Sequence, residues 1–323
     1  MRLTTGFQQS AVSLSCYRLR LLCARAPRKF FIPLIALLML SGGEAVAASQ
    51  SSADTLFWRI ERDGGVAGFL LGTIHSEDPR VLDFTDEFIG QLKNCQTFAM
   101  EMVPDLPTLT RLTAYMQYPD AATLKETIGQ QRFDRVMKAL SSYQVPEEWK
   151  ARMKLWAVMM TLSVPPPETG FFMDFSLSLR AAGAGLKVKG LETLEQQLSF
   201  LEEMPLPYQL ALLDQALDDY QRVGEIHLQM VNAYLTNDLS KLSRVAQEQF
   251  AQLDRPIRDY FLGQGIDARN QRMMENLVPM LQGSRVFVAV GALHLAGPKG
   301  LVSMLRDKGY TLIPLPLPFR ADG

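Results

Sequence analysis

The strand-like segments of this chain lie near its two ends and enclose a long helical middle. Two apolar stretches, 55–62 and 66–74, flank the turn residues 63–65 and predict a β-hairpin. Near the other end, 286–290 is the most strand-like run in the chain, and 310–315 predicts a final strand. We therefore expect an α/β fold: a small central mixed sheet built from N- and C-terminal strands and flanked by helices, with a large helical insertion.

Shorter strand signals interrupt the helical middle at two places. Residues 97–103 form an apolar run that contains one acid, and 186–191 predicts a buried strand. Apolar residues at spacings of three and four fill the segments on either side, which is typical of helices. We therefore expect a single domain over 49–323, with helical insertions at about 105–180 and 193–281.

Residues 1–48 have the order of a bacterial secretory signal peptide. A basic segment without acids precedes an apolar run at 30–40, and Ala45-Val46-Ala47 has the small-x-small form of a cleavage site. The run is much shorter than the roughly 20 apolar residues that span a bilayer. We therefore expect cleavage near Ala47 and a periplasmic or secreted protein with no stable membrane span. An uncleaved N-terminal anchor is the alternative.

Charge and cysteine content disfavour several classes of protein. The 323 residues include 33 basic and 34 acidic ones, and removal of the predicted leader would shift the net charge from −1 to −6. Without a net basic field, no nucleic acid is expected as a partner. Three cysteines, Cys16, Cys23 and Cys95, cannot build a disulfide framework or a cysteine-rich zinc site. A metal ion would have to bind histidines and carboxylates.

Two of the three histidines, His75 and His294, share one local pattern. In 70–75 and in 289–294 an apolar strand runs into glycine, and histidine follows three residues after that glycine. Glycine lets the backbone approach closely at a strand end, where open α/β sheets bind their ligands. The spacing is also compatible with hydrogen-bonded core histidines. His227 has the same G-x-x-H spacing inside a helical pattern, so we assign it a helix-surface or packing role.

His75, His294 and Glu101 form the candidate metal site. Imidazole is the commonest metal ligand, and two imidazoles with a carboxylate make a half-open site for a divalent cation. Glu101 is the candidate carboxylate because an acid inside an otherwise buried strand needs a partner. It can act as a metal ligand or as a general base. Manganese, cobalt and zinc are the candidate ions.

Five motifs follow one another in the order of a known family. They are Gly72-Thr73-Ile74-His75, Glu101, Gly190-Leu191-Glu192-Thr193 with Glu195-Gln196, Arg269-Asn270, and Val288-Ala289-Val290-Gly291-Ala292-Leu293-His294-Leu295. Over about 55–315 the chain resembles the TraB/GumN family, which includes YbaP-like bacterial proteins and is related to the Tiki metalloproteases and the erythromycin esterase and ChaN-like proteins. The resemblance implies a paired G-x-x-H metal site with the strand glutamate and, as in the Tiki branch, metal-dependent peptide hydrolysis.

The resemblance also points to further site residues. Arg269 and Asn270 match a polar pair before the second G-x-x-H strand. As catalytic candidates beside Glu101, the arginine could stabilise an oxyanion and the asparagine could ligate or orient. Their alternative is a helix-surface arginine with a capping asparagine. Glu192 matches an acid of the family or is a helix N-terminal acid. Asp174 lies at a helix start, where capping is the default, and is a further candidate.

We therefore expect an exported metal-dependent hydrolase that acts on peptide or amide bonds through the paired G-x-x-H site. Its partner would be a peptide or small-molecule substrate, and the sequence leaves its oligomeric state open. The alternative is a non-catalytic periplasmic protein that binds a haem-like ligand or a metal, or an accessory factor in export. H-E-x-x-H and G-x-S-x-G are both absent from the sequence, which disfavours a standard zinc-protease helix and a serine hydrolase.

Overall fold

The computed structural model describes residues 54–119 and 123–320, all within one compact unit of the chain. The predicted signal peptide, 1–48, lies outside the described residues. The strands are β1 (Phe57–Arg62), β2 (Gly65–Thr73), β3 (Thr97–Met100), β4 (Lys187–Gly190), β5 (Val286–Gly291) and β6 (Thr311–Leu315). Within the described residues they form one six-stranded sheet in the order β4-β3-β5-β2-β1-β6.

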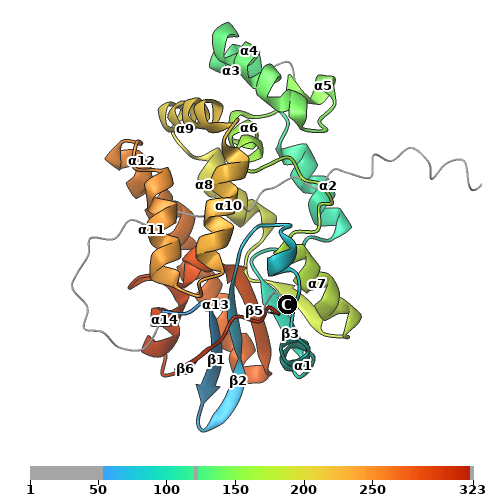
Figure 1. Ribbon diagram of the computed structural model, residues 1–323, viewed down its shortest axis with the longest axis vertical. Helices are drawn as coiled ribbons and strands as arrows, with labels where there is room; N and C mark the ends of the chain where they lie inside the picture. The colour runs from blue at the N-terminus through green and yellow to red at the C-terminus, as the bar shows by residue number, and fades with distance from the viewer. Residues whose placement is uncertain (1–53, 120–122, 321–323) are drawn as a thin grey trace, which may run out of the picture. The chain divides into compact units, whose positions relative to one another are not determined.

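Strands from the two ends of the chain lie side by side in this sheet (Figure 1). β1 pairs antiparallel with both β2 and β6, and β2 pairs parallel with β5. β3 runs parallel to β5 and β4 on its two sides. The predicted α/β fold with a central mixed sheet is therefore confirmed, and the four neighbours β4, β3, β5 and β2 all run in the same direction.

Helices occupy the long connections between the strands. The α-helices are α1 (Asp86–Lys93), α2 (Leu106–Tyr115), α3 (Leu124–Ile128), α4 (Gln130–Ala139), α5 (Glu147–Lys150), α6 (Leu155–Leu162), α7 (Met173–Gly183), α8 (Leu194–Glu202), α9 (Leu206–Asp219), α10 (Val223–Tyr234), α11 (Leu239–Gln249), α12 (Arg255–Tyr260), α13 (Ala268–Gly283) and α14 (Leu301–Asp307). Three 3₁₀ turns, η2 (Pro79–Val81), η3 (Leu140–Ser142) and η5 (Ala292–Leu295), and the π-helix η4 (Phe261–Asp267) complete the described elements. Over the described ranges, no helix is both long and apolar enough to cross a membrane.

The helices between the strands carry a core of their own. One hydrophobic cluster surrounds the sheet and includes side chains of α7, α10, α11, α13 and α14. A second cluster joins α6 to α8 and α9, and every residue of α6 is buried. Burial of apolar area is the main term that favours folding, so the helical middle is stabilised by its own packing as well as by contact with the sheet.

Two details of the strands differ from the sequence-based expectation. β3 ends at Met100, so Glu101 follows the strand instead of lying inside it. The segment expected to be a buried strand, 186–191, contains β4, which lies at the sheet edge with Lys187 and Lys189 exposed. Lysines are common on edge strands because their charge prevents pairing with other chains. The pattern of apolar residues was misleading because Leu186 and Leu191, which flank the strand, are the buried positions.

The β2–β5 pairing gives a stability prediction. A Cβ atom added at Gly68 would lie 2.1 Å from the backbone oxygen of Val286, so we expect Gly68→Ala to lower the free energy of unfolding by about 2–3 kcal/mol through forced separation of the strands. The control is Gly90→Ala in α1, where a Cβ meets open space and the higher helix propensity of alanine should add about 0.5–1 kcal/mol. Urea titration followed by circular dichroism measures both, and equal midpoints for Gly68→Ala and wild type would contradict the tight pairing.

Candidate functional site

Four chemically active side chains follow the parallel strands at one edge of the sheet. In strand order from β4 to β2 they are Glu192, Glu101, His294 and His75. The register pairs Met100 with both Gly190 and Ala289, and Thr73 with Gly291. Because parallel strands have their carboxyl ends at the same edge, residues distant in the chain come to one edge of the sheet.

Arg269 connects the two glutamates of this edge. It lies in the second position of α13, directly after the π-helix η4, and its side chain is completely buried. Its Nη2 is 2.6 Å from Glu101 Oε2 and 2.6 Å from Glu192 Oε2, and its Nε donates to Glu192 Oε2 at 2.7 Å. Arg272 adds a contact of 3.3 Å to Glu192 Oε1. The two arginines and two carboxylates form a charge-balanced network in which Arg269 and both carboxylates are buried and Arg272 is partly exposed. The alternative of a helix-surface Arg269 is therefore wrong.

The loop between β4 and α8 fixes Glu192. Thr193 is the N-cap of α8 and forms a capping box with Gln196, in which each side chain accepts a hydrogen bond from the other residue's backbone N–H. Glu192 stands just before this cap, and its backbone N–H donates to the carbonyl oxygen of Glu101 at 2.8 Å. Its carboxylate binds Arg269 and does not act as a helix N-terminal acid. In the sequence, the Gly-Leu-Glu-Thr motif indicated this position.

Glu101 is held as a carboxylate. Its Oε1 accepts a hydrogen bond of 2.8 Å from the backbone N–H of Gly291, and its Oε2 accepts one of 3.3 Å from Gln197 in addition to that from Arg269. Burial alone would raise the pKa of Glu101, but the charge of Arg269, with contributions from His294 and the Gly291 N–H, lowers it to about 2. The carboxylate is therefore ionised at neutral pH.

Asn270 determines which nitrogen of His294 carries the proton. Asn270 Nδ2 donates to the carbonyl oxygens of His294 and Lys299, at 3.2 and 2.8 Å, so its Oδ1 faces His294 Nδ1 at 2.7 Å. An amide oxygen only accepts, so Nδ1 carries the proton and Nε2 keeps its lone pair. Asn270 lies inside α13 and does not cap it, and the alternative of a capping asparagine is wrong.

His294 Nε2 is buried without a hydrogen-bond partner among the described residues, and it lies 3.8 Å from Glu101 Oε1. Burial lowers the pKa of His294 to about 3. The charge of Glu101 opposes this shift, and the charge of Arg269 adds to it. The ring is therefore neutral at pH 7, with its basic nitrogen facing a carboxylate. An imidazole oriented by a second hydrogen bond is the usual form of a histidine metal ligand.

The glycines of both G-x-x-H patterns are required by close approach. A Cβ atom on Gly72 would lie 2.9 Å from Cα of Ala292, and one on Gly291 would lie 3.2 Å from Glu101 Oε1. Neither position has a positive φ, so the constraint is space. The two glycines let the ends of β2 and β5 pack against each other and let the backbone N–H of Gly291 reach the carboxylate.

His75 has a different set of neighbours from His294. Its ring stacks on Phe172 with centroids 3.8 Å apart, and its Nδ1 lies 3.7 Å from Asp174 Oδ2. Asp174 Oδ1 accepts a hydrogen bond from the Thr73 hydroxyl. Asp174 is thus buried against His75 and does not cap α7, whose N-cap, Phe172, makes no side-chain cap. Within the described residues, both His75 nitrogens and Asp174 Oδ2 are buried without a hydrogen-bond partner.

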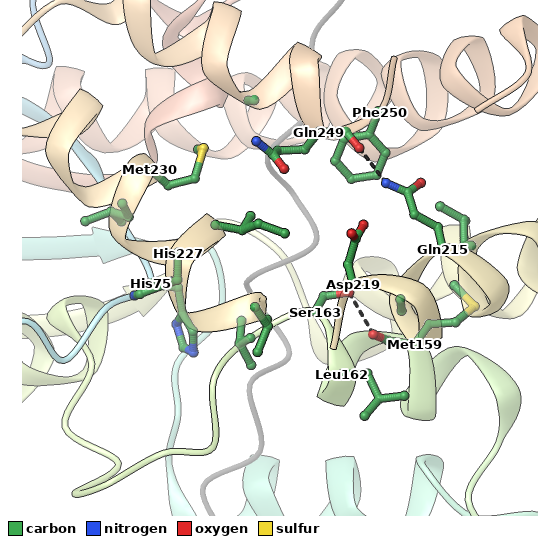
Figure 2. Close-up of a pocket in the computed structure, with 17 residues that line it drawn as sticks. His75, Met159, Leu162, Ser163, Gln215, Asp219, His227, Met230, Gln249 and Phe250 are labelled. Atoms are coloured by element: carbon green, nitrogen blue, oxygen red, sulfur yellow. Dashed lines mark hydrogen bonds between the residues drawn. The ribbon is translucent and has the colours of Figure 1, made fainter. Parts of the chain in front are cut away.

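His227 lies closer to the candidate site than its helical pattern predicted. It is half-buried on α10, and its Nε2 lies 2.9 Å from the hydroxyl of Ser76, the neighbour of His75 in the chain. Burial lowers the pKa of His227, and His75 adds to this effect. His75 and His227 both line a pocket bordered by α6, α9, α10 and α11, with the two rings at one side (Figure 2). His227 therefore has the packing role that was one of its two expected roles, but it packs beside the candidate site.

The donors present are those that bind divalent metals, but they are not gathered into one coordination sphere. Over 54–119 and 123–320, no group of three or more histidine, cysteine, aspartate or glutamate side chains is arranged so that it could hold a metal ion. The contacts instead place His294, Glu101, Arg269, Glu192 and Asn270 in one network and His75 with Asp174 in another. Cys95 is buried, and burial raises the pKa of its thiol to about 12, so it is unreactive at neutral pH.

An α/β sheet with polar residues at the carboxyl ends of its parallel strands is the expected form of an enzyme or ligand-binding protein. The sequence profile of the TraB/PrgY/gumN family matches residues 56–314. The chain therefore belongs to the TraB/PrgY/gumN family, as its motifs indicated.

Relatives of the chain include proteins from animals and bacteria. It is 23% identical to metalloprotease TIKI1 of Danio rerio over 314 residues, which cover 81% of this chain and 63% of that protein. It is 25% identical to the uncharacterized protein YbaP of Shigella flexneri over 257 residues, covering 76% of this chain and 90% of YbaP, and 25% identical to YbaP of Escherichia coli K12 over 73% of this chain and 87% of that one. The alignment thus spans less than two thirds of the TIKI1 protein. No solved structure matches.

The buried groups predict an acid-labile fold. Between pH of about 6.5 and 3 the unfolded chain binds a proton at His294 that the native ring does not, and Glu101 acts in the same direction between about 4.5 and 2. The free energy of unfolding should therefore fall as pH falls, by about 1.4 kcal/mol per pH unit from His294 alone between pH 6 and 4.5. Urea unfolding in EDTA at several pH values measures this slope.

The matched variant for this experiment is His294→Asn, which removes the titrating ring. Between pH 6 and 4.5 its free energy of unfolding should depend less steeply on pH than that of the wild type, by about 1.4 kcal/mol per pH unit, which is the contribution of one proton. Identical slopes for the variant and the wild type would show that His294 is protonated in the native protein and that the burial argument is wrong.

Proposed function

We propose that this chain is an exported metal-dependent hydrolase that cleaves peptide or amide bonds. The observation that carries the proposal is the state of His294: a neutral imidazole, oriented by Asn270, whose buried Nε2 lone pair has no partner in the described part of the chain and faces Glu101. The naming of the TIKI relatives as metalloproteases supports the same chemistry.

The described donors are not gathered into one coordination sphere, so the proposal requires that binding of the ion draws them together. His294 and His75 are the residues that would hold the metal ion, with Glu101 as a third ligand or as the base. The support for a metal site is the chemistry of these donors, because both rings have buried nitrogens without hydrogen-bond partners among the described residues. A buried, unpaired polar nitrogen costs free energy unless something binds it. When bound, a divalent ion supplies polarisation of the substrate carbonyl group and acidification of water.

The chain's own residues would supply the remaining steps. Glu101 is ionised because Arg269 lowers its pKa to about 2. A carboxylate with so low a pKa is a weak base, so Glu101 is better suited to act as a ligand or as the electrostatic partner of His294. Arg269 Nη1 is a buried donor without a partner in the described residues, so it is available to an oxygen that becomes negative during the reaction. Glu192 would act through Arg269, whose position it fixes.

Export would follow from the leader at 1–48. We propose cleavage near Ala47, which delivers the mature protein to the periplasm or the medium, where a peptide or small-molecule substrate is its partner. Sequencing of the N-terminus of the protein recovered from periplasmic extract tests this step. A protein that starts at Met1 in the membrane fraction would contradict it.

Removal of either candidate ligand should abolish metal retention. We expect His294→Ala and His75→Ala each to weaken binding of Mn²⁺, Co²⁺ or Zn²⁺ by more than about 100-fold. This exceeds the loss of affinity that is usual when a residue that only orients a ligand is removed. Both variants should also lose peptide cleavage. Calorimetric titration and elemental analysis measure binding, and cleavage of a mixed peptide library followed by mass spectrometry measures activity.

The control is His227→Ala, which removes the third histidine of the described chain and should retain metal within about twofold. Thermal unfolding of each variant separates loss of a ligand from loss of the fold. Unchanged metal content in both His75→Ala and His294→Ala would contradict the metal site. Metal retention by the wild type without turnover of any peptide would favour a non-catalytic binding protein.

A further inference from the structure

The pocket beside His75 has the lining of a binding site. Its cavity has a volume of about 120 Å³ and opens to solvent, so it has room for a single side chain and not for a large ligand. Most of its wall is apolar, with side chains from β2's end, α6, α9, α10 and α11. Examples are Met159, Leu162 and Met230 (Figure 2). The helical middle therefore places an apolar cavity directly beside one of the two strand-end histidines.

Polar atoms without partners stand at both sides of this cavity. His75 lines one side, and within the described residues both of its ring nitrogens are buried without a hydrogen-bond partner. On another side, Gln215 donates through Nε2 to the backbone oxygen of Gln249, and its buried Oε1 has no partner in the described part of the chain. Figure 2 shows Gln215 and Gln249 across the cavity from the two histidines. Gln215 Oε1 is an acceptor, and the neutral imidazole of His75 has one donor and one acceptor. These groups beside apolar walls suit a ligand that has amide groups next to an apolar group.

We propose that this pocket binds a large aliphatic or aromatic side chain of a peptide substrate, next to the bond that is cut, while a peptide N–H donates to Gln215 Oε1 and a peptide carbonyl oxygen accepts from the ring N–H of His75, whose other nitrogen is left for the metal ion. The proposal rests on the proposed hydrolase function and adds the substrate class. A glycine or alanine at this place in a substrate would leave the apolar walls in contact with water.

The charges around the pocket favour an uncharged side chain. None of the seventeen described residues that line it is lysine or arginine, so its wall has no permanently charged cationic side chain to pair with a phosphate or carboxylate. The lining acid, Asp219, has Arg222 at 3.9 Å outside the pocket. A desolvated charge without a partner is costly, so a charged substrate side chain would be disfavoured in this cavity.

Methionine methyl groups in the pocket allow a direct binding test on the metal-free or metal-loaded protein. With [methyl-¹³C]methionine, the signals of Met159 and Met230, assigned through Met159→Leu and Met230→Leu, should shift saturably with the blocked tripeptides Ala-Leu-Ala and Ala-Phe-Ala. Met304 on α14, which does not line the pocket, should not move. Affinity for these peptides should exceed that for Ala-Gly-Ala by about tenfold or more.

Ala216→Phe fills the pocket from α9, where Ala216 is half-buried and faces the cavity. This variant should abolish the shifts, whereas Ala182→Phe, on an exposed position of α7, should leave them unchanged. Equal shifts with Ala-Gly-Ala, no shifts with any peptide, or shifts that persist in a folded Ala216→Phe would overturn the proposal. Binding of N-methyloctanamide without binding of the peptides would overturn the peptide assignment and indicate an acyl chain.

Cleavage kinetics separate this inference from the proposed function. If both are right, Ala216→Phe should lower kcat/KM for a leucine-containing substrate by about tenfold or more and leave metal content unchanged. Specific binding of the leucine peptide by a wild-type protein that cleaves nothing would overturn the hydrolase function while the pocket assignment stands. Cleavage with equal kcat/KM for leucine- and glycine-containing substrates would overturn the pocket assignment alone.

Discussion

The buried contact of Arg269 with Glu101 and Glu192 is the interaction on which the candidate site depends. Removal of one partner from such a network leaves an uncompensated charge at a cost of about 3–5 kcal/mol, so each of the three holds the others. The arginine joins the loops after β3 and β4 to the start of α13. Because Asn270 is the next residue along α13, the same helix turn that neutralises the glutamates also orients His294.

The layout of the fold could be predicted from the sequence because the strongest apolar runs lie at the two ends of the chain. The β1–β2 hairpin follows from those runs and from the turn glycines, and the strands of the two ends share one sheet, as expected, although their particular pairing was not predicted. The edge position of β4 could not be predicted, because a four-residue strand flanked by buried leucines has the apolar pattern of a central one. Likewise, Glu101 follows β3 because strand ends depend on hydrogen bonding to neighbours that the local sequence does not contain.

Contacts across the molecule decided which polar residues belong together. The G-x-x-H spacing at the end of an apolar strand singled out His75 and His294, but the partners Asn270 for one and Phe172 with Asp174 for the other come from helices distant in the chain. His227 has the same spacing as the strand-end histidines and was set aside because it lies on a helix. Packing of α10 near the end of β2 nevertheless brings it to Ser76 and to the pocket beside His75. Helices of the middle segment thus form the walls of the pocket beside His75, next to the carboxyl ends of the parallel strands.

A crystal of the protein grown with Mn²⁺ or Zn²⁺, with anomalous scattering measured at the absorption edge of the ion, tests the central claim most directly. The account predicts one strong anomalous peak at bonding distance from His294 Nε2, about 2.0–2.1 Å for zinc, with His75 as a second ligand and Asn270 still bonded to Nδ1. A fully loaded crystal in which the ion binds elsewhere, and in which His294 Nε2 has no metal within bonding distance, would contradict it.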